Sequence, residues 1–130
     1  MTNSKKYIGL KVLSVIAIIF GLLTLKSGGE VLFIDGAGRV AAGNYVPFVL
    51  WSNFLLGFLY VVAGVGLWSQ KSWAVWLAIF ILIVTLVVFI AFGWHINNGG
   101  LFEARTVKAM FMRSGVWTVI AMVSYLRLIR

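Results

Sequence analysis

Apolar residues gather in four long runs along the chain, at about residues 8–25, 47–67, 73–92 and 107–126. A helix needs about 20 residues to cross the hydrocarbon core of a bilayer, and each run approaches that length. Polar residues concentrate in the segments between the runs, and the third run carries no charge. The pattern predicts an all-α polytopic membrane protein: one membrane domain over 1–130, with four transmembrane helices in an up-down-up-down bundle.

The composition agrees with a bilayer protein and excludes several chemistries. Hydrophobic residues make up 62% of the chain and charged residues 11%, whereas soluble domains average about 45–50% and about 25%. The absence of cysteine excludes disulfides and iron–sulfur clusters, and a single histidine excludes a bis-histidine haem. We therefore expect no cofactor. The net charge of +8 comes from Lys and Arg at the ends of the apolar runs, which indicates contact with lipid headgroups rather than with nucleic acid.

The basic residues predict an orientation in the inner (plasma) membrane, with both termini in the cytoplasm. The inner side then holds six of them and the outer side five, namely Lys5, Lys6, Lys11, Lys71, Arg127 and Arg130 against Lys26, Arg39, Arg105, Lys108 and Arg113. Aromatic residues fit headgroup belts at the two ends of the runs: Trp68, Trp73 and Trp76 inside, and Tyr45, Trp51 and Trp94 outside.

Stripes of small and polar residues predict how the helices pack, because helices in lipid associate through close contact of such residues. The stripes lie on the first, second and fourth runs: Ser14, Ala17 and Gly21; Asn53, Gly57, Tyr60 and Gly64; Ser114, Thr118, Ala121 and Tyr125. We expect Asn53 to bond a hydroxyl or carbonyl of a neighbouring helix. The third run, almost wholly aliphatic, is expected to face lipid or another subunit over much of its surface.

Residues 26–46 are predicted to form an outer loop between the first two helices. The loop is rich in glycine but has neither the spacing of a phosphate-binding loop nor the carboxylates of an EF-hand. Its apolar stretch "VLFI" indicates a segment that lies in the interface and covers the outer mouth of the bundle.

A polar cluster on the outer side is the candidate functional site, formed by His95, Glu103, Arg113, Glu30 and Asp35. The histidine and the three carboxylates are metal-ligand types, but their spacing matches no ligand motif, so no metal is predicted there. Arg113 lies within the fourth run, where an arginine is costly and suggests function. Three interpretations stay open for it: an ion pair with one of the three carboxylates, snorkelling to the outer headgroups, or ligand binding.

No arrangement for catalysis is present, so we expect no enzyme: there is no nucleophile–histidine–acid set and no pair of catalytic carboxylates. No apolar run contains Asp or Glu, which argues against a proton-coupled multidrug exporter of this size.

The stretch "GNYVPFVLWSNFLLGFLYVVAGVGLWSQKSWAVWLAIFI", residues 43–81, resembles the DoxX-like small membrane proteins. It has their Gly-rich apolar second helix, short basic turn and aliphatic third helix. The resemblance implies a four-helix bundle that often serves as an accessory partner of a redox or transport system, and it assigns no catalytic residue.

The first functional expectation is therefore a non-catalytic accessory or assembly subunit, or a self-assembling homo-oligomer, in contact with the lipid bilayer. A small transporter or channel component with a polar outer vestibule is the first alternative, and an outer-face metal-binding membrane protein is the second.

Overall fold

The computed structural model describes residues 2–33, 36, 40, 43 and 46–129, with the side chains of the first helix described from Ile8 onward. Within these residues the chain is all helical. The helices are α1 (Thr2–Phe33), α3 (Pro47–Trp68), α4 (Ser72–Asn97) and α5 (Ala104–Leu128). The prediction of an all-α protein with four long apolar helices is confirmed.

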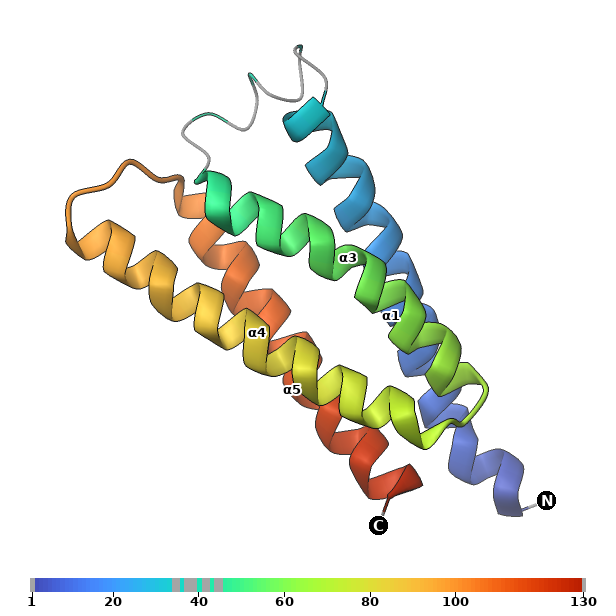
Figure 1. Cartoon of the computed structure of the whole chain (residues 1–130). Coiled ribbons are helices and arrows are strands. Elements are labelled where there is room, and N and C mark those ends of the chain that lie inside the picture. The colour runs from blue at the N-terminus through green and yellow to red at the C-terminus, as the bar shows by residue number, and fades with distance from the viewer. Residues whose placement is uncertain (1, 34–35, 37–39, 41–42, 44–45, 130) are drawn as a thin grey trace.

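Each helix is long and apolar enough to cross a membrane, over Ile8–Phe33, Pro47–Trp68, Ser72–Asn97 and Ala104–Leu128. The chain is therefore a small multi-pass membrane protein in contact with lipid. Successive helices run in opposite directions (Figure 1). The two termini and the α3–α4 turn lie at one end, and we refer to the opposite end, with the α1–α3 and α4–α5 connections, as the loop end.

Helix α1 continues further than the sequence predicted, so the expected loop from residue 26 is wrong in its start. The helix runs through Gly28 and ends at Phe33. Packing on α3 explains the difference: a Cβ at Gly28 would come within 3.0 Å of Phe54, and the Phe33 ring meets the Phe54 ring edge-on at 5.5 Å. These contacts compensate for the low helix propensity of two adjacent glycines. "VLF" is thus helical, and Ile34 lies outside the described residues.

Small residues bring α1 and α3 into close contact, as predicted. Ser14, Ala17 and Gly21 are buried, and so are Asn53, Gly57, Tyr60 and Gly64. A Cβ at Gly21 would stand 2.8 Å from the carbonyl oxygen of Gly57, and one at Gly64 would stand 2.9 Å from that of Ser14. The two backbones therefore meet through their glycines.

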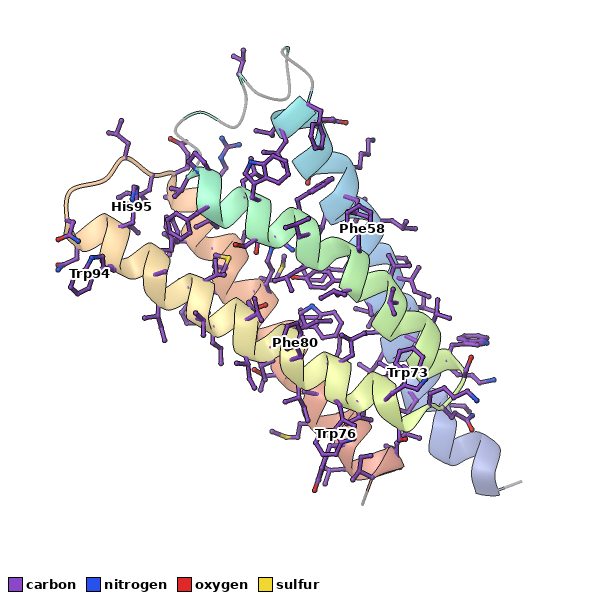
Figure 2. The ribbon with its side chains drawn as sticks, viewed as in Figure 1. Phe58, Trp73, Trp76, Phe80, Trp94 and His95 are labelled. Atoms are coloured by element: carbon purple, nitrogen blue, oxygen red, sulfur yellow. The ribbon has the colours of Figure 1, made fainter. Side chains whose placement is uncertain are left out.

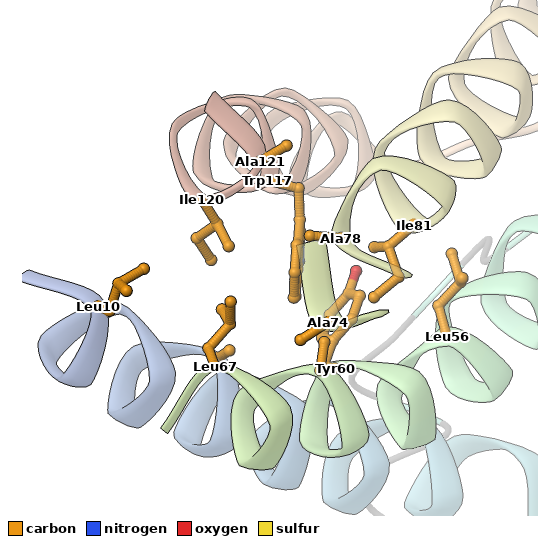
Figure 3. Packing of buried hydrophobic residues seen from close by; sticks show 12 residues of the cluster. Leu10, Leu56, Tyr60, Leu67, Ala74, Ala78, Ile81, Trp117, Ile120 and Ala121 are labelled. Carbon is orange, nitrogen blue, oxygen red and sulfur yellow. The ribbon is translucent and has the colours of Figure 1, made fainter. Parts of the chain in front are cut away.

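The centre of the bundle is filled by side chains from all four helices (Figure 3). Tyr60 and Trp117 are fully buried there, with ring centroids 4.8 Å apart. A second buried cluster lies toward the loop end and consists of Val46, Val49, Val88, Phe92 and Met110.

The stripe predicted on α5 is confirmed only in part: Ala121 is buried and Ser114 is half-buried, but the rest of it faces outward. Thr118 and Tyr125 are exposed, while Met110, Trp117, Ile120, Ala121 and Ser124 are buried. The Thr118 hydroxyl bonds the Ser114 carbonyl of its own helix at 2.7 Å, so it needs no partner from another helix. Large side chains together with Ala121 and Ser124 form the packed face of α5.

Helix α4 buries one stripe, namely Ala74, Val75, Ala78, Ile81, Thr85, Val88 and Phe92, and exposes apolar side chains elsewhere, as predicted. Trp73 and Trp76 lie toward one end of the bundle, and Trp94 lies at the other (Figure 2). All three are about half exposed or more, as interfacial aromatic residues are. Tyr45 lies outside the described residues.

Candidate functional site

Arg113 connects three helices at the loop-end half of the bundle. Its Nη1 donates to the Thr24 hydroxyl of α1 at 3.0 Å and to the Tyr60 hydroxyl of α3 at 3.2 Å. Its guanidinium carbon also lies 4.9 Å from the centre of the Phe20 ring. The cation is therefore held by hydroxyl dipoles and aromatic faces, which attract it without neutralising its charge.

No described carboxylate pairs with Arg113. Glu103 lies instead 3.8 Å from Arg105. Arg113 forms no ion pair with Glu30 among the described residues, and Asp35 lies outside them. The interpretation of Arg113 as an ion-pair partner of Glu103 or Glu30 is wrong, because its side chain turns across the bundle toward Thr24.

The contact with Thr24 also keeps the charge deep. Arg113 lies nine residues beyond the start of α5 at Ala104, which corresponds to about 14 Å along the helix. Thr24 likewise lies nine residues before the end of α1 at Phe33. The guanidinium therefore stays at this depth and does not snorkel toward the loop end, so that interpretation is wrong as well.

A pocket of about 240 Å³ leads from the loop end to Arg113, between the first turns of α3 and α5. Its lining residues are Val46, Val49, Leu50, Asn53, Glu103, Arg105, Thr106, Ala109 and Arg113. Arg105 and Glu103 lie at its mouth, and Gly43, with a positive φ of 64°, lies beside Glu103. The polar cluster thus forms a site in part: Glu103 and Arg113 line one pocket.

Asn53 forms part of the same pocket and is only 8% exposed. Its Nδ2 donates to the Met110 sulfur at 3.3 Å, whereas its Oδ1 has no hydrogen-bond partner among the described residues. The prediction of a hydroxyl or carbonyl partner for Asn53 is therefore wrong. The observed partner is a thioether, which is only a weak acceptor. A buried amide oxygen without a donor costs free energy, and a ligand donor in the pocket would relieve that cost.

Replacing Asn53 by leucine is expected to leave the free energy of unfolding unchanged or to raise it by up to about 1 kcal/mol, because an unsatisfied oxygen is removed while the branched shape of the side chain is kept and the adjoining pocket has room for the added hydrogens. Unfolding of the purified protein in mixed micelles measures this. Asn53→Ala is the matched control and is expected to destabilise the fold by leaving a void. A loss above about 2 kcal/mol for Asn53→Leu would show instead that the amide holds the helices together.

The pocket ends inside the bundle. The Tyr60 ring, whose hydroxyl Arg113 contacts, packs at a tilt on the Trp117 ring, and both belong to the apolar core at the centre of the bundle (Figure 3). The buried cluster of Val46, Val49, Val88, Phe92 and Met110 packs the pocket wall formed by Val46 and Val49 against α4. The described residues therefore form a site open toward the loop end and closed toward the other end, which suits binding better than passive conduction.

His95 lies apart from this pocket, at the end of α4 (Figure 2). Its Nε2 lies 3.0 Å from the Leu101 carbonyl oxygen, and its ring meets Phe48 edge-on at 6.1 Å. A separate hollow beside it is lined by Phe48, Trp94, Asn98 and Gly100, among others. Within the described parts of the chain, no three metal-ligating side chains come together. His95 thus holds the α4–α5 connection in place.

Sequence reasoning missed the partners of Arg113. Thr24 and Tyr60 belong to other apolar runs, and neither was assigned to the polar cluster. The signal available was a buried hydroxyl on each of the two helices that the small-residue stripes bring together.

The fold and the pocket define a class: a small multi-pass membrane protein with a half-buried arginine that lines a largely apolar pocket and has no acidic partner among the described residues. Comparisons with protein-family models, with curated proteins and with solved structures found no match.

Proposed function

We propose that the protein is a non-catalytic, membrane-embedded binding protein whose loop-end pocket takes a ligand bearing an oxyanion, a carboxylate or a phosphate. One observation carries the proposal: Arg113 lies deep in a pocket, with hydroxyl and aromatic neighbours and no acidic partner among the described residues. A charge in such surroundings is costly unless an opposite charge approaches it. Arginine also matches the two oxygens of these anions by geometry.

The mouth of the pocket supports the same ligand class. Arg105 lies at the entrance and attracts an approaching anion, while Glu103 moderates that field at 3.8 Å. Glu103, Asn53 and Thr106 add acceptors or a hydroxyl to the lining. The pocket therefore suits a ligand that combines an anion with hydrogen-bond donors.

Sodium phosphate or sodium butyrate is expected to raise the Tm of the purified protein above that in sodium chloride of equal ionic strength. A ligand at a hundredfold excess over its Kd stabilises the folded state by about 2.7 kcal/mol. Arg113→Gln is expected to abolish the shift, because the amide keeps a donor but not the charge. Lys108→Gln is the matched control, since Lys108 is exposed on the same helix and does not line the pocket. Equal shifts for wild type and Arg113→Gln would overturn the proposal.

A transporter component with this pocket as its outer vestibule is the second candidate function. The same pocket supports it, but the closed base requires a rearrangement of the helices before a solute can cross. Solute flux into liposomes that Glu103→Gln or Arg113→Ala abolishes would favour this function, and absence of flux in the wild type would exclude it.

The accessory-subunit or homo-oligomer function remains a proposal with less support. The small-residue stripes of α1 and α3 are buried against each other within one chain and so are not available to join subunits. Its remaining support is the exposed apolar face of α4, which includes Phe80, Ile83 and Ile90, and the resemblance to DoxX-like proteins. A mass in mild detergent equal to one chain, without a co-purifying protein, would contradict it.

We also propose that the loop end faces outward from the inner membrane and that both termini are cytoplasmic. The termini lie at the same end of the bundle as Lys11, Lys71 and Arg127. Single cysteines replacing Ser69 and Asn98 test this: the first is expected to react only from the cytoplasmic side, and the second only from outside.

A further inference from the structure

We infer that the ligand of the loop-end pocket is an amphiphile of the bilayer. Its oxyanion binds Arg113, and its apolar tail leaves the pocket between α1 and α5. This inference rests on the proposed oxyanion-binding function and adds to it the chemical class of the ligand and its route of entry. Three features carry it: the walls of the pocket, the unused donors of Arg113 and the unsatisfied oxygen of Asn53.

The described walls of the pocket indicate the route by which the tail of a lipid would leave it. Its described lining comes from α3, α5 and the residues just before them, and no described residue of α1 contributes. The side toward α4 is filled by the buried cluster of Val46, Val49, Val88, Phe92 and Met110. Helices α1 and α5 pack against each other least among the neighbouring pairs of the bundle. We therefore place the route of the apolar tail at the α1–α5 boundary, on the loop-end side of the Arg113–Thr24 hydrogen bond.

The depth of the pocket fits a ligand that comes from the headgroup layer. It spans from Arg105 to Arg113, about 12 Å along α5. Val46, Val49, Leu50 and Ala109 provide apolar walls over this distance. A small hydrated anion gains nothing from these walls, whereas an amphiphile buries apolar surface against them.

The hydrogen bonds of Arg113 leave one edge of the guanidinium for a ligand. Both hydrogens of Nη1 are used, one by Thr24 and one by Tyr60. Nε is buried without a partner, and no hydrogen bond joins Nη2 to any residue that the structure describes. Nη2 is the donor left for an oxygen of a carboxylate or phosphate, and a second oxygen completes the side-by-side pairing with Nε once a neighbouring side chain moves aside.

The unsatisfied Oδ1 of Asn53 specifies a further property of the ligand. An amide oxygen repels an oxyanion but accepts a hydrogen bond from a hydroxyl. The pocket thus combines a donor for an anion, Arg113, with an acceptor for a neighbouring hydroxyl, Asn53. Glu103 and Thr106 add further acceptors to its lining. Phosphatidylglycerol has this chemistry: an anionic phosphate and hydroxyl groups beside it. Phosphatidylcholine has no such donor and carries no net charge.

Retention of lipid by the purified protein tests the inference. The full chain is incubated in non-ionic detergent with equal amounts of phosphatidylglycerol, phosphatidic acid and phosphatidylcholine of identical chains, and native mass spectrometry counts the lipids that remain bound. We expect one phosphatidylglycerol per chain in preference to phosphatidylcholine. Arg113→Gln is expected to weaken that retention about tenfold or more, and Lys108→Gln to leave it unchanged.

Two further variants guard against a trivial loss of the fold. Ala109→Phe fills the pocket without altering a charge and is expected to remove phosphatidylglycerol while helical content is kept. The wild type is expected to retain phosphatidylglycerol better than phosphatidic acid, which lacks the glycerol hydroxyls. Asn53→Leu is expected to remove that preference but to keep the preference of both lipids over phosphatidylcholine.

The outcomes separate this inference from the proposed function. If phosphate or butyrate stabilises the protein through Arg113 but phosphatidylglycerol is retained no better than phosphatidylcholine, the ligand comes from water and the amphiphile is wrong. If Arg113→Gln and Lys108→Gln weaken the retention of phosphatidylglycerol equally, that retention depends only on the positive charge of the protein surface, and the inference is overturned. If neither the soluble anions nor the anionic lipids depend on Arg113, the inference and the proposed function fail together.

Discussion

Gly21→Ala is expected to lower the free energy of unfolding by about 2 kcal/mol, because overpacking a close contact costs about 1–3 kcal/mol. The added methyl group would stand 2.8 Å from the Gly57 carbonyl oxygen and 2.9 Å from the Tyr60 Cβ. One of these neighbours is backbone, so it moves only if α1 and α3 separate. That separation would also displace Thr24 and Tyr60, which bind Arg113. Unfolding of the purified protein in mixed micelles gives the free energy.

Gly9→Ala is the matched control within the same helix. No atom lies within 4 Å of a Cβ at Gly9. Alanine there is expected to stabilise the helix by about 0.5–1 kcal/mol, since glycine is the poorer helix former. The two substitutions therefore have opposite signs. Equal effects at the two positions would contradict close packing of α1 on α3.

Trp117→Ala is expected to cost about 3–5 kcal/mol, the range for removing a large aromatic side chain from a packed interior. Trp117 is fully buried, and its ring centroid lies 4.8 Å from that of Tyr60. The surrounding alanines on α4 and α5, which include Ala78 and Ala121, are too short to fill the void. The loss of packing, rather than contact with water, causes the cost in a membrane.

Trp94→Ala provides the comparison for that effect. Trp94 is 71% exposed at the loop end of α4 and lies at the surface of the bundle. Its removal is expected to change the free energy of unfolding by less than about 0.5 kcal/mol, as surface substitutions do. A similar cost for both tryptophans would show that Trp117 does not occupy the packed centre.

Much of the fold was predictable, because the length of an apolar run and the spacing of glycines are local properties. The contact between α1 and α3 was predicted from the small residues Ala17, Gly21, Gly57 and Gly64, and the structure confirms it. The end of α1 was not predictable in this way: Gly28 and Gly29 resemble a loop until Phe54 is known to pack over them. The inward face of α5 depended on where the large Trp117 side chain fits, which single-helix patterns do not contain.

The candidate site was predictable as a composition but not as an arrangement. Arg113 stood out because an arginine in an apolar run is costly, whereas Asn53 was predicted only to join helices. Their meeting in one pocket depends on the relative rotation of α3 and α5. The charge of Arg113 suggested a carboxylate partner. The packing of α1 and α3 on α5 instead places the hydroxyls of Thr24 and Tyr60 within hydrogen-bond distance of it.

Protection of a single thiol in the pocket tests oxyanion binding most directly, and the absence of cysteine from the chain makes it simple. Ala109→Cys places the thiol in the pocket lining, and Lys108→Cys places one on the adjacent exposed position. Phosphatidylglycerol or phosphate is expected to slow alkylation of the first thiol by a neutral maleimide and not of the second, and adding Arg113→Gln is expected to remove that protection. Alkylation of the pocket thiol at the same rate with and without these anions would contradict a binding site at Arg113.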